Sequence, residues 1–435
     1  MSMSILIVLV FIIGYLAIAG EHAIRINKAA TALITGGICW TIVVLGSSTF
    51  FPENGQEVIE HALSHHLTEI ASILFFLIGA MTIVEVIDAH EGFSIITDKI
   101  NTKSYIKLLW IIGLITFFFS ALLDNLTTAI VMCALLRKLI KDNHILMLFG
   151  GIVIIAANAG GAWSPIGDVT TIMLWIGQQI SAYNVVIKLF IPSLICVLLP
   201  LAFSTLVLKR LNKTIEKDGF GKDEVSHFTN FERKLILALG VCGLLFVPVF
   251  KTVTHLPPYL GMMISLSVVW IISELLHRKK DHEKIKNATI TNVISRIDVP
   301  TVLFFLGILL AVGALQTIGH LGLLATWLDN TFGNIYLINL IIGGLSAIVD
   351  NVPLVAAAMG MYSLETYPQD HLFWESLAFC AGTGGSMLII GSAAGVAVMG
   401  ILKIDFMWYL KNVSWLALIG YLAGMAAFVL QNKLF

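Results

Sequence analysis

The sequence predicts an all-α polytopic membrane protein, an inverted repeat with two re-entrant helical hairpins and two broken transmembrane helices. Three observations lead to this prediction. First, 58% of the residues are apolar and only 12% are charged, whereas soluble domains carry about 25% charged residues; this excludes a soluble enzyme, a disordered protein and a secreted disulfide scaffold. Second, the apolar runs are continuous rather than alternating, which favours helices over barrel strands. Third, three sequence blocks recur in the same order in the two halves of the chain.

The apolar runs that can cross or enter a bilayer follow one another along the whole chain, and a full span needs about 20 such residues. The first run has no basic segment before it, so we expect a retained span rather than a cleaved signal. The runs cover residues 3–20, 29–46, 69–88, 106–140, 145–177, 182–208, 234–250, 259–276, 299–318, 335–363, 372–402 and 412–430.

Two of these runs are interrupted at their centres by the same polar dipeptide. The run 106–140 contains Asp124-Asn125, and the run 335–363 contains Asp350-Asn351. If the chain folds back at each dipeptide, the arms have about 15 residues and reach roughly 23 Å, which is too short for the ~30 Å hydrocarbon core. We therefore expect two re-entrant hairpins with these dipeptides at their tips.

The basic residues predict the orientation, because short cytoplasmic loops are enriched in Lys and Arg. With both hairpins in place, the basic loops 209–234 and 278–298 fall on one side of the membrane, while the loop 47–68, which has no Lys or Arg, faces the other. The basic residues that depart from this pattern are Lys188, Lys251 and Lys433. We expect a multi-pass protein of the cell (inner) membrane with both termini on the non-cytoplasmic side.

The internal repeat is visible in three matched blocks. ILFFL at 73–77 corresponds to VLFFL at 302–306, SALLDN at 120–125 to SAIVDN at 346–351, and Gly160, Gly161 and Gly167 to Gly384, Gly385 and Gly391. In the predicted topology the first copy starts outside and the second inside, so the copies are inverted. The chain then divides into N-terminal scaffold spans (1–68), a first repeat (69–180), connecting spans (181–297), a second repeat (298–403) and a C-terminal span (404–435).

We expect the glycine-rich segments to break one helix in each repeat, at 145–177 and 372–402. In the first of these, Gly160, Gly161 and Pro165 disfavour a continuous helix. Inverted repeats with broken helices are the sequence signature of secondary transporters, whose site lies where the repeats meet. Oxygen-bearing side chains, which suit a hard monovalent cation, surround both breaks. They are Asn158, Ser164, Asp168, Thr170 and Thr171 in the first repeat, and Thr383, Ser386 and Ser392 in the second.

Carboxylates inside the spans are the strongest functional signal. Asp124, Asp168 and Asp350 lie deep in apolar sequence, and Asp298 lies at the entry of a span. A charged side chain at the bilayer centre costs about 2.5 kcal/mol or more, so it marks an ion or proton path by default. Because burial disfavours the charged form, such a carboxylate can exchange a proton for a cation. The alternative role is structural, as a cap of a hairpin tip or of a half-helix, and for Asp298 an interfacial position.

We assign roles to these residues as follows. Asp124 and Asp350 carry the ion and the proton, and the Na⁺ site lies at these two carboxylates and the surrounding oxygens. Neutral oxygens come from the neighbouring polar side chains of both repeats, while Asp168 completes the first half-site. The neutral and completing residues are Ser120, Asn125, Asn158, Thr170, Thr171, Ser346, Asn351 and Ser386.

A polar segment precedes the run 69–88 and contains Glu57, Glu60, His61, His65, His66 and Glu69. His61 and His65 have the i, i+4 spacing of metal ligands on a helix, but no Glu follows His61, so the zinc-protease motif HExxH is absent. We expect an exposed outer segment, with pH sensing as the alternative.

These residues resemble the NhaD-type sodium/proton antiporters of the ion transporter superfamily. The resemblance covers essentially the whole chain, from Ile26 to Ala29 through both Asp-Asn dipeptides, and its most specific positions include Asp124, Asp168, Asp298 and Asp350. It implies exchange of Na⁺ or Li⁺ for protons at alkaline pH, and a dimer in which a moving unit works against a scaffold. In the anion-carrying relatives the hairpin tip usually reads Ser-Asn-Thr, so the Asp here favours a cation. Asp168 is matched by Ser392 in the second repeat, which makes the two halves unequal.

The sequence therefore predicts a secondary transporter, not an enzyme, that exchanges Na⁺ (or Li⁺) for H⁺ by alternating access in sodium and pH homeostasis. Its expected partners are the lipid bilayer, the transported ions and a second copy of the chain, with no cofactor and no nucleic acid. One alternative is a Na⁺-coupled di- or tricarboxylate symporter, although neither tip holds Lys or Arg. A remote alternative is an intramembrane aspartyl protease with an Asp124–Asp168 dyad, although Asp168 follows Pro-Ile-Gly rather than Gly-x-Gly.

Overall fold

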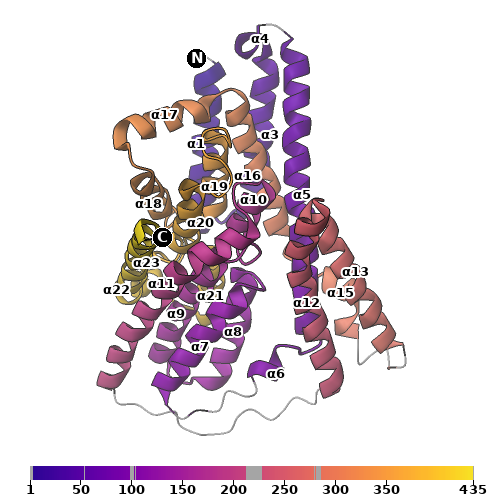
Figure 1. Ribbon diagram of the computed structural model, residues 1–435, viewed down its shortest axis with the longest axis vertical. Helices are drawn as coiled ribbons and strands as arrows, with labels where there is room; N and C mark the ends of the chain where they lie inside the picture. Colours follow the sequence, from indigo (N-terminus) through magenta and orange to yellow (C-terminus); the bar gives the residue numbers. More distant parts are fainter. Residues whose placement is uncertain are drawn as a thin grey trace.

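The computed structural model describes residues 3–52, 54–97, 102, 104–211, 228–278, 280 and 286–434. These residues form helices and no strands (Figure 1). Eight described helices are long and apolar enough to cross a membrane, and α1, α7, α18 and α19 are shorter apolar helices. The all-α membrane fold is therefore confirmed. The basic loops expected at 209–234 and 278–298 lie partly outside the described residues.

The helices fall into three sets. The membrane-length helices are α3 (Lys28–Leu45), α5 (Gly55–Ala89), α9 (Asn143–Ala162), α11 (Ala182–Leu211), α12 (Asn230–Thr254), α13 (Pro258–His277), α16 (Val299–Thr317) and α23 (Ser414–Leu434). The arms and half-helices are α1 (Met3–Ala19), α7 (Tyr105–Ser120), α8 (Asn125–Leu139), α10 (Val169–Ile176), α18 (Ile335–Leu345), α19 (Asn351–Met361), α20 (Leu372–Gly384) and α21 (Ala393–Leu402). Short connecting helices are α2 (Glu21–Ile24), α4 (Ser47–Phe50), α6 (Ser94–Thr97), η1 (Lys286–Ala288), α15 (Ile290–Ile294), α17 (His320–Phe332) and α22 (Phe406–Asn412).

The prediction of a loop at 47–68 is wrong, because most of this segment is helical. Helix α5 begins at Gly55 and runs for 35 residues, roughly 52 Å at 1.5 Å per residue, so it extends well beyond a bilayer core. The segment 56–68 has no Gly or Pro to stop a helix, and hydropathy alone marks where a helix leaves lipid rather than where it ends. The polar segment is therefore helical.

Both predicted helix breaks at the Asp-Asn dipeptides are present. In the first hairpin α7 ends at Ser120 and α8 begins at Asn125, with Asp124 as its N-cap. In the second, α18 ends at Leu345 and α19 begins after the N-cap Asp350. Asp124 has a φ of 111°, a backbone conformation that costs a non-glycine residue of order 1–3 kcal/mol and that occurs mainly at functional sites.

The two glycine-rich breaks lie where the sequence predicts them, between α9 and α10 and between α20 and α21. Helix α9 packs against both α20 and α21, so the two broken helices meet at the centre of the protein. In Figure 1 the hairpin α7–α8 lies beside α9 and α21, while α3, α5 and α16 form a separate group above them.

The same tertiary contacts occur in both halves. Ser120 Oγ donates to Ala157 O at 2.5 Å, and Ser346 Oγ donates to Ala381 O at 3.0 Å. Glycine is required where each broken helix crosses its hairpin, because a Cβ on Gly160 or on Gly384 would collide with a backbone carbonyl of α7 or α18. These equivalent contacts support the internal repeat, whereas its inversion across the membrane stays a prediction.

Candidate functional site

The two hairpin tips and the two helix breaks meet in one buried polar cluster, which we call the Asp168 cluster. It consists of Asn125, Asn158, Asp168, Thr170, Asn351, Ser386 and Ser392, all of them buried. Residues from both halves of the chain contribute, so the cluster lies where the two predicted repeats meet, the position at which secondary transporters bind their cargo.

The Asp168 carboxylate is the centre of this cluster and its side chain is almost fully buried, at 1% exposure. It caps α10, and one oxygen accepts hydrogen bonds from Thr170 N at 2.9 Å and Thr170 Oγ1 at 3.0 Å. The other oxygen accepts from Asn125 Nδ2 at 2.9 Å and from Asn351 Nδ2 at 3.3 Å. Each hairpin tip thus directs one amide to the same carboxylate.

Asn158 connects the two halves. Its Oδ1 accepts from Asn125 Nδ2 at 3.1 Å, and its Nδ2 donates to Ser386 Oγ and to Ser392 Oγ, both at 2.9 Å. Because side-chain amides offer both a donor and an acceptor, Asn158 joins the first tip to the break between α20 and α21. Ser392 therefore takes part in the cluster as the structural counterpart of Asp168.

The remaining hydroxyls of the expected site serve the backbone. Thr171 Oγ1 donates to Asp168 O at 2.9 Å, while Ser120 and Ser346 donate to carbonyls of α9 and α20 as described above. Ser164 Oγ donates to Ala121 O at 2.5 Å. These bonds hold the hairpin tips against the broken helices, which positions the polar groups of the cluster.

Asp124 lies at the first tip, with its hydrogen bonds directed along its own helix. Its carboxylate accepts from Thr127 N at 2.8 Å and from Thr127 Oγ1 at 2.7 Å. Asp124 and Asp350 are both close enough to interact electrostatically with Asp168. Asp124 and Asp168 share no described hydrogen bond, and the Asp168 oxygens are taken by neutral donors, an arrangement unlike an aspartyl protease dyad.

Asp350, at the second tip, forms an ion pair with Lys28 at the start of α3, with an Nζ–Oδ2 distance of 2.7 Å. The side chains are 12% and 24% exposed, respectively. Lys28 Nζ also lies 4.4 Å from the centre of the Phe304 ring, and its ammonium interacts with Asp298 and Glu21. Lys28 is not among the site residues predicted from the sequence, since its partner Asp350 is 322 residues away.

Asp298 belongs to the surroundings of Lys28 rather than to the Asp168 cluster. It is the N-cap of α16 and accepts from Thr301 N at 3.2 Å. The structure therefore brings together Asn125, Asn158, Asp168, Thr170, Asn351 and Ser386 from the sequence-predicted set. It places Asp124, Asp350 and Asp298 around them with other partners.

Comparison with known proteins agrees with this architecture. The family model described as citrate transporter (CitMHS) matches residues 6–378. The chain is 46% identical to "Sodium/proton antiporter 1" of Arabidopsis thaliana over 435 residues, which is all of this chain and 73% of that protein. It is 31% identical to "Na(+)/H(+) antiporter NhaD" of Alkalimonas amylolytica over 450 residues, 97% of this chain and 89% of that one. The chain belongs to the NhaD-type antiporter family, within the wider citrate transporter family.

The fold of this NhaD-type chain has a counterpart among solved structures. The crystal structure of the Alcanivorax borkumensis YdaH transporter, described as having an unusual topology, superposes with a TM-score of 0.60. The match covers 94% of this chain and 99% of that chain at 10% identity, so it shows a shared fold. The family match and the antiporter relatives, rather than this fold likeness, identify the protein as a transporter and not an enzyme.

Proposed function

We propose that this chain exchanges Na⁺ for H⁺ across the membrane, with the Asp168 carboxylate holding either the cation or the proton. One observation carries the proposal: a single buried carboxylate receives only neutral donors in the described structure, from Thr170 and from the amides of both tips. No described lysine or arginine pairs with it. A buried carboxylate without a fixed countercharge favours a bound cation or a proton.

Exchange follows from charge balance at this carboxylate. When Na⁺ arrives, the proton leaves Asp168, and the cation neutralises the carboxylate in its place. Asn125 and Asn351, which donate their amide N–H groups to Asp168, carry oxygens that can coordinate Na⁺ after the amides turn. Asn158, Thr170, Thr171 and Ser386 supply further neutral oxygens. The Asp124 carboxylate adds negative potential that attracts cations to the first tip.

The family description raises citrate as a second cargo, but the cluster argues against it. A tricarboxylate needs positive or donor-rich groups without nearby negative charge, whereas Asp124 and Asp350 interact electrostatically with Asp168. Lys28, at the second tip, is already paired with Asp350. Because like charges repel, these carboxylates disfavour a polyanion.

We further propose that the chain works as a homodimer in the cell (inner) membrane, with both termini on the non-cytoplasmic side, and that Li⁺ can replace Na⁺. In alternating access the hairpins and broken helices move against α3, α5 and α16. The Lys28–Asp350 ion pair joins these two groups, so it has to open during the transport cycle.

The proposal is tested in everted vesicles by dequenching of a pH-gradient dye when Na⁺, Li⁺ or K⁺ is added separately. We expect Na⁺ and Li⁺ to cause dequenching with the wild-type protein and not with Asp168→Asn. Radiolabelled citrate uptake serves as the second arm. Citrate uptake without cation-dependent dequenching would refute the proposal.

A further inference from the structure

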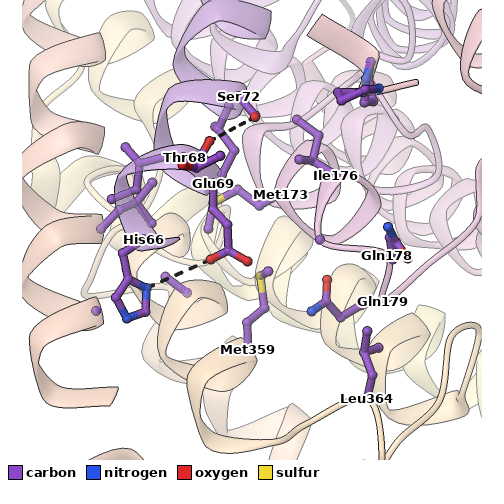
Figure 2. A pocket seen from close by; sticks show the side chains of 18 of the residues that line it. His66, Thr68, Glu69, Ser72, Met173, Ile176, Gln178, Gln179, Met359 and Leu364 are labelled. Atoms are coloured by element: carbon purple, nitrogen blue, oxygen red, sulfur yellow. Dashed lines mark hydrogen bonds and ion pairs between the residues drawn. The ribbon is translucent and has the colours of Figure 1, made fainter. Parts of the chain in front are cut away.

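A cavity of about 420 Å³ lies apart from the Asp168 cluster, between α5, α10, α16 and α19. Figure 2 shows His66 and Glu69 of α5 on one wall, with Met359 of α19 and Gln179 after α10 opposite them. None of the Asp168-cluster residues lines this space. We call it the α5–α19 cavity.

Three neighbouring side chains of α5 have metal-ligand geometry, and two of them, His66 and Glu69, line the cavity. His65, His66 and Glu69 each direct one ligand atom to a common region, and these atoms lie within 4.8 Å of one another. His65 Nδ1 lies 3.8 Å and His66 Nδ1 lies 4.0 Å from Glu69 Oε2. Two ligands of one tetrahedral Zn²⁺, each at about 2.0–2.1 Å, are roughly 3.4 Å apart. The two His–Glu separations exceed this value by about 0.5 Å, and the three ligand atoms together lie within 4.8 Å.

The surroundings of His66 prepare its Nδ1 for a metal. Thr317 Oγ1 donates its hydrogen to Gly313 O at 2.8 Å, so at 3.2 Å it accepts from His66 Nε2–H. The neutral ring then carries its proton on Nε2 and presents the Nδ1 lone pair towards Glu69. A second nitrogen fixed by a hydrogen-bond acceptor is the usual support of a metal-binding histidine. Trp40, whose ring centre is 6.0 Å from that of His66, helps to fix the ring.

The lysine that lines the cavity, Lys251, has partners of its own. Lys251 Nζ donates to Trp175 O at 2.5 Å and lies 4.6 Å from the centre of the Trp175 ring. The Glu69 carboxylate and the His66 ring face the open space of the cavity, and the carboxylate attracts a cation.

We propose that His65, His66 and Glu69 bind a divalent transition-metal cation of the Zn²⁺ class, with its remaining coordination positions open to the α5–α19 cavity. The His₂Glu set is that of an open zinc site, which keeps a position for water.

The test is metal binding by the purified protein, measured with ZnCl₂ by elemental analysis after desalting and with CoCl₂ by the visible absorption of four-coordinate Co²⁺. We expect one metal per chain in the wild type, and at least tenfold weaker binding in His65→Ala and Glu69→Gln. Because these side chains are 60% and 59% exposed, both variants fold normally. The matched control is His61→Ala, an exposed histidine one turn earlier on the same helix.

A third variant tests the supporting contact. Thr317→Val removes the acceptor of His66 Nε2–H, and loss of such a partner typically weakens metal binding 10–100-fold. Zn²⁺ binding that is absent, or equal in the wild type and in His65→Ala and Glu69→Gln, would overturn the proposal. Metal binding is measured without Na⁺ exchange, so its result does not depend on the proposed function. Na⁺/H⁺ exchange is measured separately in proteoliposomes, which keeps a failure of the proposed function distinct from a failure of metal binding.

Discussion

The ion pair between Lys28 and Asp350 provides a quantitative prediction, because it joins α3 to the second hairpin tip. The perturbation is Lys28→Met, which keeps the length of the side chain and removes its charge. The variant leaves Asp350 unpaired at 12% exposure and removes the ammonium that also faces Asp298 and Glu21. Three carboxylates then lose a common countercharge.

The magnitude follows from the distance. At 2.7 Å and an effective dielectric constant of about 20, the Coulomb attraction is roughly 6 kcal/mol, from which the desolvation of both groups must be subtracted. Breaking a buried pair costs about 3–5 kcal/mol, and an exposed pair contributes about 0–1 kcal/mol. With both groups mostly buried, we expect Lys28→Met to lower the free energy of unfolding by about 3 kcal/mol.

The assay is equilibrium unfolding by SDS in mixed micelles, followed by tryptophan fluorescence, within a double-mutant cycle. Asp350→Asn keeps the cap on Val352 N, because Asn and Asp cap helices about equally well. The double variant Lys28→Met/Asp350→Asn leaves no unpaired charge in the pair, so we expect a coupling energy of about 1.5 kcal/mol or more. Additive single effects, or a loss below about 0.5 kcal/mol for Lys28→Met, would refute the reasoning.

Two further predictions concern packing and pH. A Cβ at Gly160 would collide with Phe117 O, so Gly160→Ala should lower the free energy of unfolding by about 1–3 kcal/mol and reduce exchange. A Cβ at Gly37 would meet no atom within 4 Å, so Gly37→Ala should leave stability and exchange intact. Burial lowers the pKa of His90, just beyond the end of α5, to about 4, and its Nε2 already accepts from His277 at 3.0 Å. As the pH falls, the unfolded state protonates His90 at a higher pH than the folded state does, so the free energy of unfolding should fall by up to about 3 kcal/mol between pH 6.5 and 4. This pH dependence should flatten in His90→Gln. Equal effects of the two glycine variants, or an unchanged pH profile in His90→Gln, would contradict these expectations.

The helix breaks could be predicted from sequence because their causes are local. Asp and Asn cap a new helix start, and Gly160, Gly161 and Pro165 disfavour helix continuation. The long helix α5 could not be predicted in the same way, since hydropathy reports where lipid ends rather than where a helix stops. The arrangement of the secondary structure thus follows from short-range signals, apart from segments outside the bilayer.

The partners within the site could not be predicted, because they depend on long-range contacts. Asn351 reaches Asp168 across 183 residues, and Asp350 turns to Lys28 rather than to the cluster. Symmetry between the repeats favoured the paired carboxylates Asp124 and Asp350 as carriers. The geometry favours Asp168, which has Ser392 as its counterpart, and only a structure shows which carboxylate receives both amides.

The central claim, that Asp168 holds the transported cation, is tested most directly by ²²Na⁺ binding to purified protein in a scintillation proximity assay over a range of pH. We expect the wild type to bind Na⁺ in competition with protons and Asp168→Asn to lose at least tenfold in affinity. Asp405→Asn, which replaces the N-cap of the short helix α22, serves as the matched control and should behave as wild type. Na⁺ binding by Asp168→Asn with wild-type affinity and pH dependence would contradict the claim.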